Sequence, residues 1–161
     1  MKSIIPVILV LVMVVLGCNQ FKNRMSRSSS SFEQYKGSLT ELLPAEFSGS
    51  VIKFKLSATQ DAISEHPGAK EAKRFTYLQE AAGVSVQVAG ALVNYPTSQL
   101  AEKRLREIAA DVGATVIAKG KWQRFTSKDS KTVGWTNGSV MALAQSTAAK
   151  PASNFEEYAP F

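Results

Sequence analysis

Apolar and polar residues alternate along several stretches of the chain, as they do in β-strands with one face buried. In the first stretch Ile52, Phe54 and Leu56 share one side and lysines occupy the other. Asn137-Gly138 separates the last two stretches and is typical of a two-residue hairpin turn. The expected strands cover residues 50–57, 75–82, 84–95, 115–125, 131–136 and 139–146.

Residues 97–112 have the period of an amphipathic helix. Thr97 or Ser98, after Pro96, begins this helix, and Gly113 ends it where a left-handed residue is favoured. We expect its buried face to consist of Leu100, Leu105, Ile108, Ala109 and Val112.

The C-terminal tail is expected to close the core rather than to recruit a partner. Ser153 and Glu156 predict a capped helical turn. This turn places Phe155 and Tyr158 on one face, with Phe161 near them.

The order of these elements predicts a small single domain of the α+β class over residues 37–161. We expect a mostly antiparallel sheet with one main helix packed on one face and the short final helix on that same face. Gly90 falls on the apolar side in the middle of a strand, which indicates a bulge or the close approach of a helix.

The N-terminus departs from this pattern with a continuous apolar block. After Met1-Lys2-Ser3, residues 4–16 are almost entirely Ile, Val, Leu and Met, with one proline. As a helix, this block would reach about 20 Å, which is short of the ~30 Å hydrocarbon core of a bilayer. A basic start followed by a short apolar block and a small residue is typical of a secretory signal peptide.

The residues at the end of the block are more specific. Val15-Leu16-Gly17-Cys18 resembles the lipobox of bacterial lipoproteins, although Leu16 stands where a small residue is common. The resemblance implies a signal peptide over residues 1–17 that is cleaved between Gly17 and Cys18. It also implies a diacylglyceryl group on the Cys18 thiol and an N-acyl chain on its freed amine, which together give durable membrane attachment. Ordinary cleavage that leaves a free thiol, and an uncleaved short anchor, are the alternatives.

Residues 18–36 are expected to be a flexible tether, because they are polar and contain four consecutive serines. The bases Lys22, Arg24 and Arg27 could contact an anionic leaflet or simply keep the tether soluble. Asn19 is not the aspartate that commonly retains such lipoproteins in the inner membrane. The resemblance therefore favours the outer membrane, where the source has one.

Little in the sequence supports catalysis. A single cysteine and a single histidine exclude a disulfide within the chain and a Cys/His zinc cluster. His66 precedes Pro67 in an expected loop with no nucleophile elbow near it, and no glycine motif for phosphate binding is present. We expect no enzymatic activity, no metal site and no cofactor apart from the lipid on Cys18.

The full chain has a formal net charge of +6. The candidate binding site in its body is a stretch that is both basic and aromatic. Bases interleaved with aromatic rings hold anionic ligands, and in an exported protein these are lipid headgroups or envelope polysaccharide rather than nucleic acid. The alternative is that Trp122 and Trp135 belong to the core and the lysines protect strand edges. The candidate patch comprises Lys119, Lys121, Trp122, Arg124, Lys128 and Lys131.

Together these features predict an exported envelope lipoprotein, anchored on the extracytoplasmic side of a membrane through acylated Cys18. We expect it to act as a non-catalytic binding or accessory module, with an envelope protein or an anionic envelope polymer as partner. A second hypothesis is a small-ligand binder with a pocket between the helix at 97–112 and the sheet, where Gly90 leaves space. A third is a hydrolase with an unrecognised site near His66.

Overall fold

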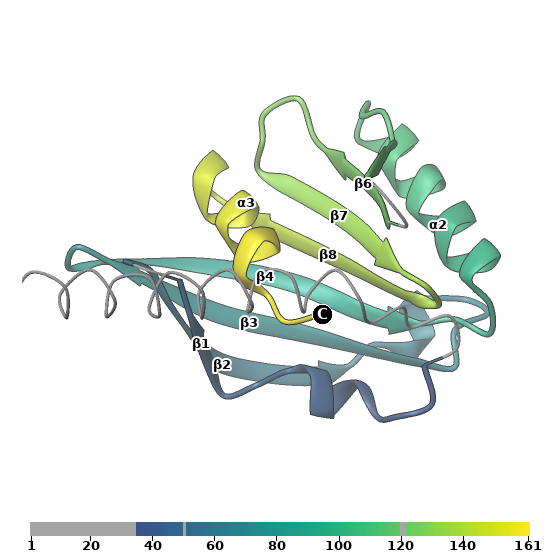
Figure 1. The fold of residues 1–161 in the computed structure, drawn as a ribbon, viewed down its shortest axis with the longest axis horizontal. Helices are drawn as coiled ribbons and strands as arrows, with labels where there is room; N and C mark the ends of the chain where they lie inside the picture. The colour runs from purple at the N-terminus through teal and green to yellow at the C-terminus, as the bar shows by residue number, and fades with distance from the viewer. Residues whose placement is uncertain (1–34, 50, 120–121) are drawn as a thin grey trace, which may run out of the picture. The chain divides into compact units, whose positions relative to one another are not determined.

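The computed structural model describes residues 35–49, 51–119 and 122–161, which form a small α+β domain (Figure 1). The expected signal peptide, Cys18 and most of the expected tether lie outside the described residues. The strands are β1 (Glu46–Ser48), β2 (Lys53–Asp61), β3 (Glu71–Ala81), β4 (Val84–Asn94), β5 (Ile117–Lys119), β6 (Trp122–Thr126), β7 (Thr132–Asn137) and β8 (Val140–Ser146). The helices are the 3₁₀ turns η1 (Leu39–Leu42) and η2 (Ile63–Glu65), and the α-helices α2 (Ser98–Asp111) and α3 (Ala149–Tyr158).

All described strands belong to one antiparallel sheet, in the order β1-β2-β3-β4-β8-β7-β6-β5. The first half of the chain builds β1 to β4, and α2 then crosses to the far edge. The second half returns inward, so that β8 pairs with β4. This confirms the predicted α+β class with its antiparallel sheet and one main helix on one face.

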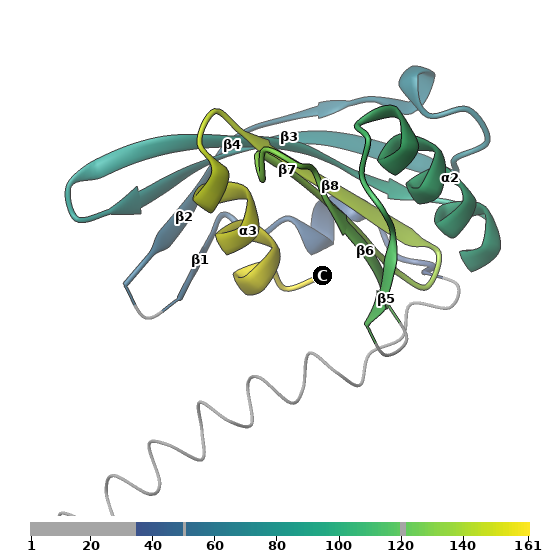
Figure 2. The same ribbon diagram turned by 90° about the horizontal axis from the view of Figure 1, so that it is seen from above.

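The two α-helices cover opposite faces of the sheet rather than the single face that we expected (Figure 2). The reason is that the central strands are apolar on both sides. On β4, Leu92 packs into the core beneath α3, whereas its neighbour Val93 packs into the core beneath α2. On β8, Ala142 and Met141 divide in the same way. We call the two sides of the sheet the α2 face and the α3 face.

The core on the α3 face is largely aromatic, and the C-terminal tail closes it as predicted. Phe155 and Phe161 are buried, and the ring of Phe161 stacks on Trp135 with centroids 6.1 Å apart. The predicted cap at Ser153 is wrong, because α3 already begins at Ala149 and has no side-chain cap. The apolar contacts of α3 fix its position without help from a capping residue.

The core on the α2 face consists mainly of small residues, which allow the helix to lie close to the strands. The side chain of Thr97 caps α2, and Gly113 follows its end with φ +64°, as predicted. The predicted buried face was partly wrong. The fully buried positions are Ala101, Leu105 and Ala109, whereas Val112 is 38% exposed.

The strands of the second half differ from the predicted ones in number and position. The predicted strand over residues 115–125 is two strands, β5 and β6, which pair antiparallel with Lys119 opposite Trp122. In the β7–β8 hairpin, the two central residues are Gly138, with φ +60°, and Ser139. The turn thus lies one residue later than predicted, with glycine in the first central position.

Position 90 requires glycine because the neighbouring strands approach it closely. Neither a bulge nor a helix is the reason. It stands in regular register, opposite Phe75 on β3 and Ala144 on β8. A Cβ atom at this position would overlap the carbonyl oxygen of Leu143 and the ring of Phe75.

In the described part of the chain, none of the helices has the length and apolar character needed to cross a membrane. No group of three or more His, Cys, Asp or Glu side chains among residues 35–49, 51–119 and 122–161 could hold a metal ion.

Candidate functional site: a groove on the α2 face

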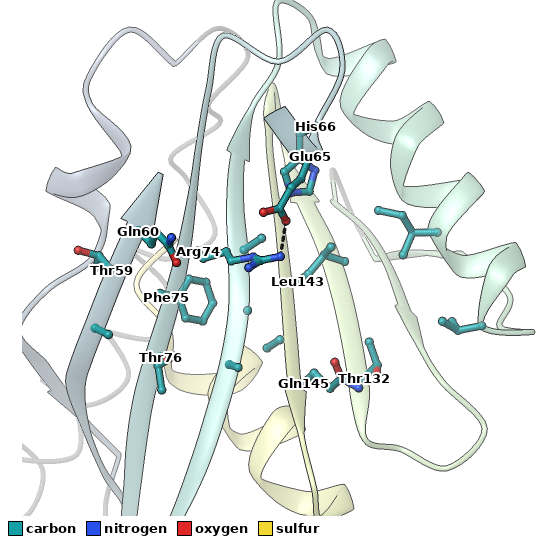
Figure 3. Close-up of a pocket in the computed structure, with 17 residues that line it drawn as sticks. Thr59, Gln60, Glu65, His66, Arg74, Phe75, Thr76, Thr132, Leu143 and Gln145 are labelled. Atoms are coloured by element: carbon teal, nitrogen blue, oxygen red, sulfur yellow. Dashed lines mark ion pairs between the residues drawn. The ribbon is translucent and has the colours of Figure 1, made fainter. Parts of the chain in front are cut away.

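The α2 face of the sheet is only partly covered. Helix α2 packs over β6, β7 and β8, and the middle of β2, β3 and β4 lies beside it without a helix above (Figure 2). This bare region forms a groove of about 650 Å³ (Figure 3).

The strand register explains why the floor of the groove is shallow and partly apolar. Residues directly opposite one another in neighbouring strands point to the same face, so each register position forms a row across the sheet. One row consists of Ala58, Thr76, Ala89, Gln145 and Thr132. The next row consists of Gln60, Arg74, Ala91 and Leu143. On β4, in the middle of the sheet, both rows have an alanine, Ala89 and Ala91, which leaves space above the strand.

Two elements rise above this floor as walls. The last turns of α2 contribute Ile108 and Val112, and the segment after β2 contributes Glu65 and His66. Ala62, at the start of that segment, is buried against the α2-face core and holds η2 over the sheet. The groove therefore runs across the strands, from β2 towards the end of α2.

Polar groups gather at the η2 wall. An ion pair of 2.6 Å joins Arg74 Nη2 to Glu65 Oε2, and both side chains are about half exposed. Burial lowers the pKa of His66, as do the guanidinium groups of Arg74 and Arg104, against the opposing effect of the Glu65 carboxylate. The imidazole is therefore neutral at pH 7 and presents one hydrogen-bond donor and one acceptor.

This arrangement suits binding better than covalent chemistry. The carboxylate of Glu65 is engaged by Arg74, and Figure 3 shows that pair beside His66. Within the described ranges, the imidazole of His66 forms no hydrogen bond with a serine hydroxyl or a carboxylate. The groove thus combines a partly apolar floor with a polar end, and ligand sites commonly combine apolar surface with a few polar groups.

The described members of the predicted basic patch lie in different surroundings. Lys121 and the side chain of Lys119 lie outside the described residues. Arg124 Nη2 forms a 2.6 Å ion pair with Glu156 of α3, and these side chains are only 24% and 13% exposed. This contact attaches α3 to β6, so the charge of Arg124 is neutralised within the fold. Lys128 and Lys131 are exposed in the β6–β7 connection.

The aromatic residues of the same stretch belong to the core. Trp135 is buried, and its indole Nε1 donates a hydrogen bond of 3.1 Å to the carbonyl oxygen of Phe161. Trp122 is half-buried against the α3-face core. Neither ring is a free platform for a ligand.

No family model matches this sequence, and neither a curated protein nor a solved structure matches it.

The groove was only partly foreseeable from the sequence. One hypothesis placed a pocket between the helix at 97–112 and the sheet, but Ala101, Leu105 and Ala109 fill that interface, and the groove lies beside the helix instead. Gly90 does line the groove. A more useful signal was that each of three successive strands has a small residue on this face, namely Ala58, Thr76 and Ala89. Those positions become one row only when the strand register is known.

Proposed function

We propose that this chain is a lipid-anchored binding module of the bacterial cell envelope, without catalytic activity of its own. The observation that carries the proposal is the groove on the α2 face, with its partly apolar floor and its polar end. The anchor rests on the lipobox-like residues Val15-Leu16-Gly17-Cys18.

The ligand that fits the groove is a small amphiphile with an anionic end. Its apolar part would lie over Ala89 and Leu143 and against Ile108. Its anionic end would meet Arg74, whose guanidinium has five N–H donors and so retains capacity beyond Glu65. The neutral ring of His66 adds a hydrogen bond. A module held beside a bilayer meets such molecules in its own compartment.

The anchor is tested by replacing Cys18 with serine. We expect the Cys18→Ser chain to lose incorporation of labelled fatty acid completely, because serine offers no thiol for the thioether. Intact-mass analysis of the native and variant proteins, each produced in a bacterial host with labelled palmitate, measures this loss. Recovery of the native protein with an unmodified thiol would overturn the anchor and leave the groove unaffected.

The groove is tested by filling it. We expect Ala89→Trp to weaken binding of dodecanoate at least ~10-fold, because the indole would occupy the space over the floor that the apolar chain needs. Gln87→Trp is the matched control, because Gln87 is exposed on the same face of β4 but does not line the groove. Amide chemical shifts followed during a titration report both the affinity and the site. Equal affinity in the two variants, or shifts remote from the groove, would contradict the proposal.

A further inference from the structure

One long strand of the sheet has an uncovered edge. Strand β2 has nine residues, but β1 pairs only with its first three, Lys53 to Lys55. The amide of Leu56 donates to the carbonyl of Ala45 at 2.8 Å, and the pairing ends there. Beyond that point, residues 57–61 are all exposed, and no described strand pairs with their outer side.

This open edge differs from the rest of the sheet boundary. The terminal strands β1 and β5 have three residues each, and short strands are a common protection against edge-to-edge pairing. In residues 57–61 the protective features lie at the two ends: a register irregularity at Ser57, and Asp61, which forms an ion pair with Lys73. The residues between them, Ala58-Thr59-Gln60, are uncharged.

We propose that a second copy of this chain pairs with this edge, β2 against β2, antiparallel about a two-fold axis at Thr59. In that register Thr59 faces Thr59, Ala58 faces Gln60, and Ser57 faces Asp61. No like charges meet, and a Thr–Thr pair is a favourable cross-strand neighbour. The length also matches, because β1 ends the open stretch on one side and the chain leaves the strand for η2 on the other.

The pairing also completes the groove. Ala58 and Gln60 begin the two rows of the groove floor at its open end. When Ala58 pairs with Gln60 of the second copy, the row that begins at Ala58 continues into the second copy's row that begins at Gln60. Both rows then lie on the same face of one continuous sheet. The two grooves then meet end to end across the axis. The inference rests on the edge geometry and not on whether the groove holds a ligand.

Single cysteines on a Cys18→Ser full-length background test the register, because Cys18 is the sole cysteine of the chain. At the axis, Thr59→Cys places two Cα atoms about 5 Å apart, within the ~7 Å limit of a disulfide. Ser57→Cys separates its own pair by about 14 Å, and it is the matched control. The purified chain in mild detergent is oxidised, and dimers are counted on a non-reducing gel. Five paired residues are fewer than a standard interface contains, so trapping is preferred to a size measurement.

We expect rapid dimers with Thr59→Cys and none with Ser57→Cys alone. A mixture of Ser57→Cys with Asp61→Cys should crosslink, and adding Thr59→Lys to both chains should abolish that product by facing two lysines across the axis. Circular dichroism checks that each variant is folded. Equal crosslinking of Thr59→Cys and Ser57→Cys, or absence of any Thr59→Cys dimer, would overturn the inference.

Discussion

Replacement of Phe155 by alanine is expected to lower the free energy of unfolding by about 3–5 kcal/mol, the largest effect of any single truncation in this domain. Phe155 lies at the centre of the aromatic core on the α3 face and is fully buried. Its ring stacks on Phe75 at 5.1 Å between centroids. Five other rings lie within 6.5 Å of it: Phe47, Phe54, Tyr77, Trp135 and Phe161.

The loss has two sources. The truncated side chain forfeits its transfer free energy, and the cavity cannot collapse because two contacts hold the C-terminal part of α3 and the residues that follow it. The Arg124–Glu156 ion pair attaches α3 to β6, and the carbonyl oxygen of Phe161 accepts a hydrogen bond from the Trp135 indole. Urea denaturation followed by tryptophan fluorescence measures the change. Phe155→Leu is the matched control, with an expected loss of about 1–1.5 kcal/mol. A loss below ~1 kcal/mol for Phe155→Ala would show that α3 does not pack on this core.

Replacement of Gly90 by alanine is expected to cost about 3 kcal/mol, at the upper end of the range for overpacking. A single methyl group there would overlap the backbone carbonyl oxygen of Leu143 as well as the Phe75 ring. A backbone atom in a paired strand cannot rotate away, so β4 and β8 would have to separate where they pair. The groove floor next to Gly90 would be distorted by the same movement.

Gly134→Ala is the control for this prediction. Gly134 is also a strand glycine, but the three atoms nearest to an added Cβ all belong to side chains, those of Phe125 and Leu143. Side chains can move, so we expect a cost of about 1–2 kcal/mol. Thermal unfolding of both variants under one buffer condition ranks them. If Gly134→Ala proves the more damaging, the close backbone approach at Gly90 is not as described.

The predictions that held depend on neighbours in the chain. The Thr97 cap and the left-handed Gly113 follow from the preferences of a few consecutive residues. The predicted cap at Ser153 failed because tertiary packing positioned α3 instead. The prediction that Phe155 joins the core held, because helical spacing already placed it on one face with Tyr158.

The predicted basic patch shows which contacts cannot be predicted from neighbouring residues in the sequence. The spacing of bases and aromatic residues between 119 and 135 is visible in the sequence. The partner of Arg124 is Glu156, which lies 32 residues away in the chain and reaches Arg124 only because α3 folds onto β6. The groove and the open edge of β2 depend in the same way on strands that are distant in sequence.

The sequence by itself determined the class of the domain and the order of its longer elements, because hydrophobic period and turn chemistry act over short distances along the chain. The tertiary structure alone decided which face each helix covers, since β4 and β8 are apolar on both sides. It also decided that Ala58, Thr76 and Ala89 share one bare row. Register between strands is set by packing across the whole sheet, and no local pattern contains it.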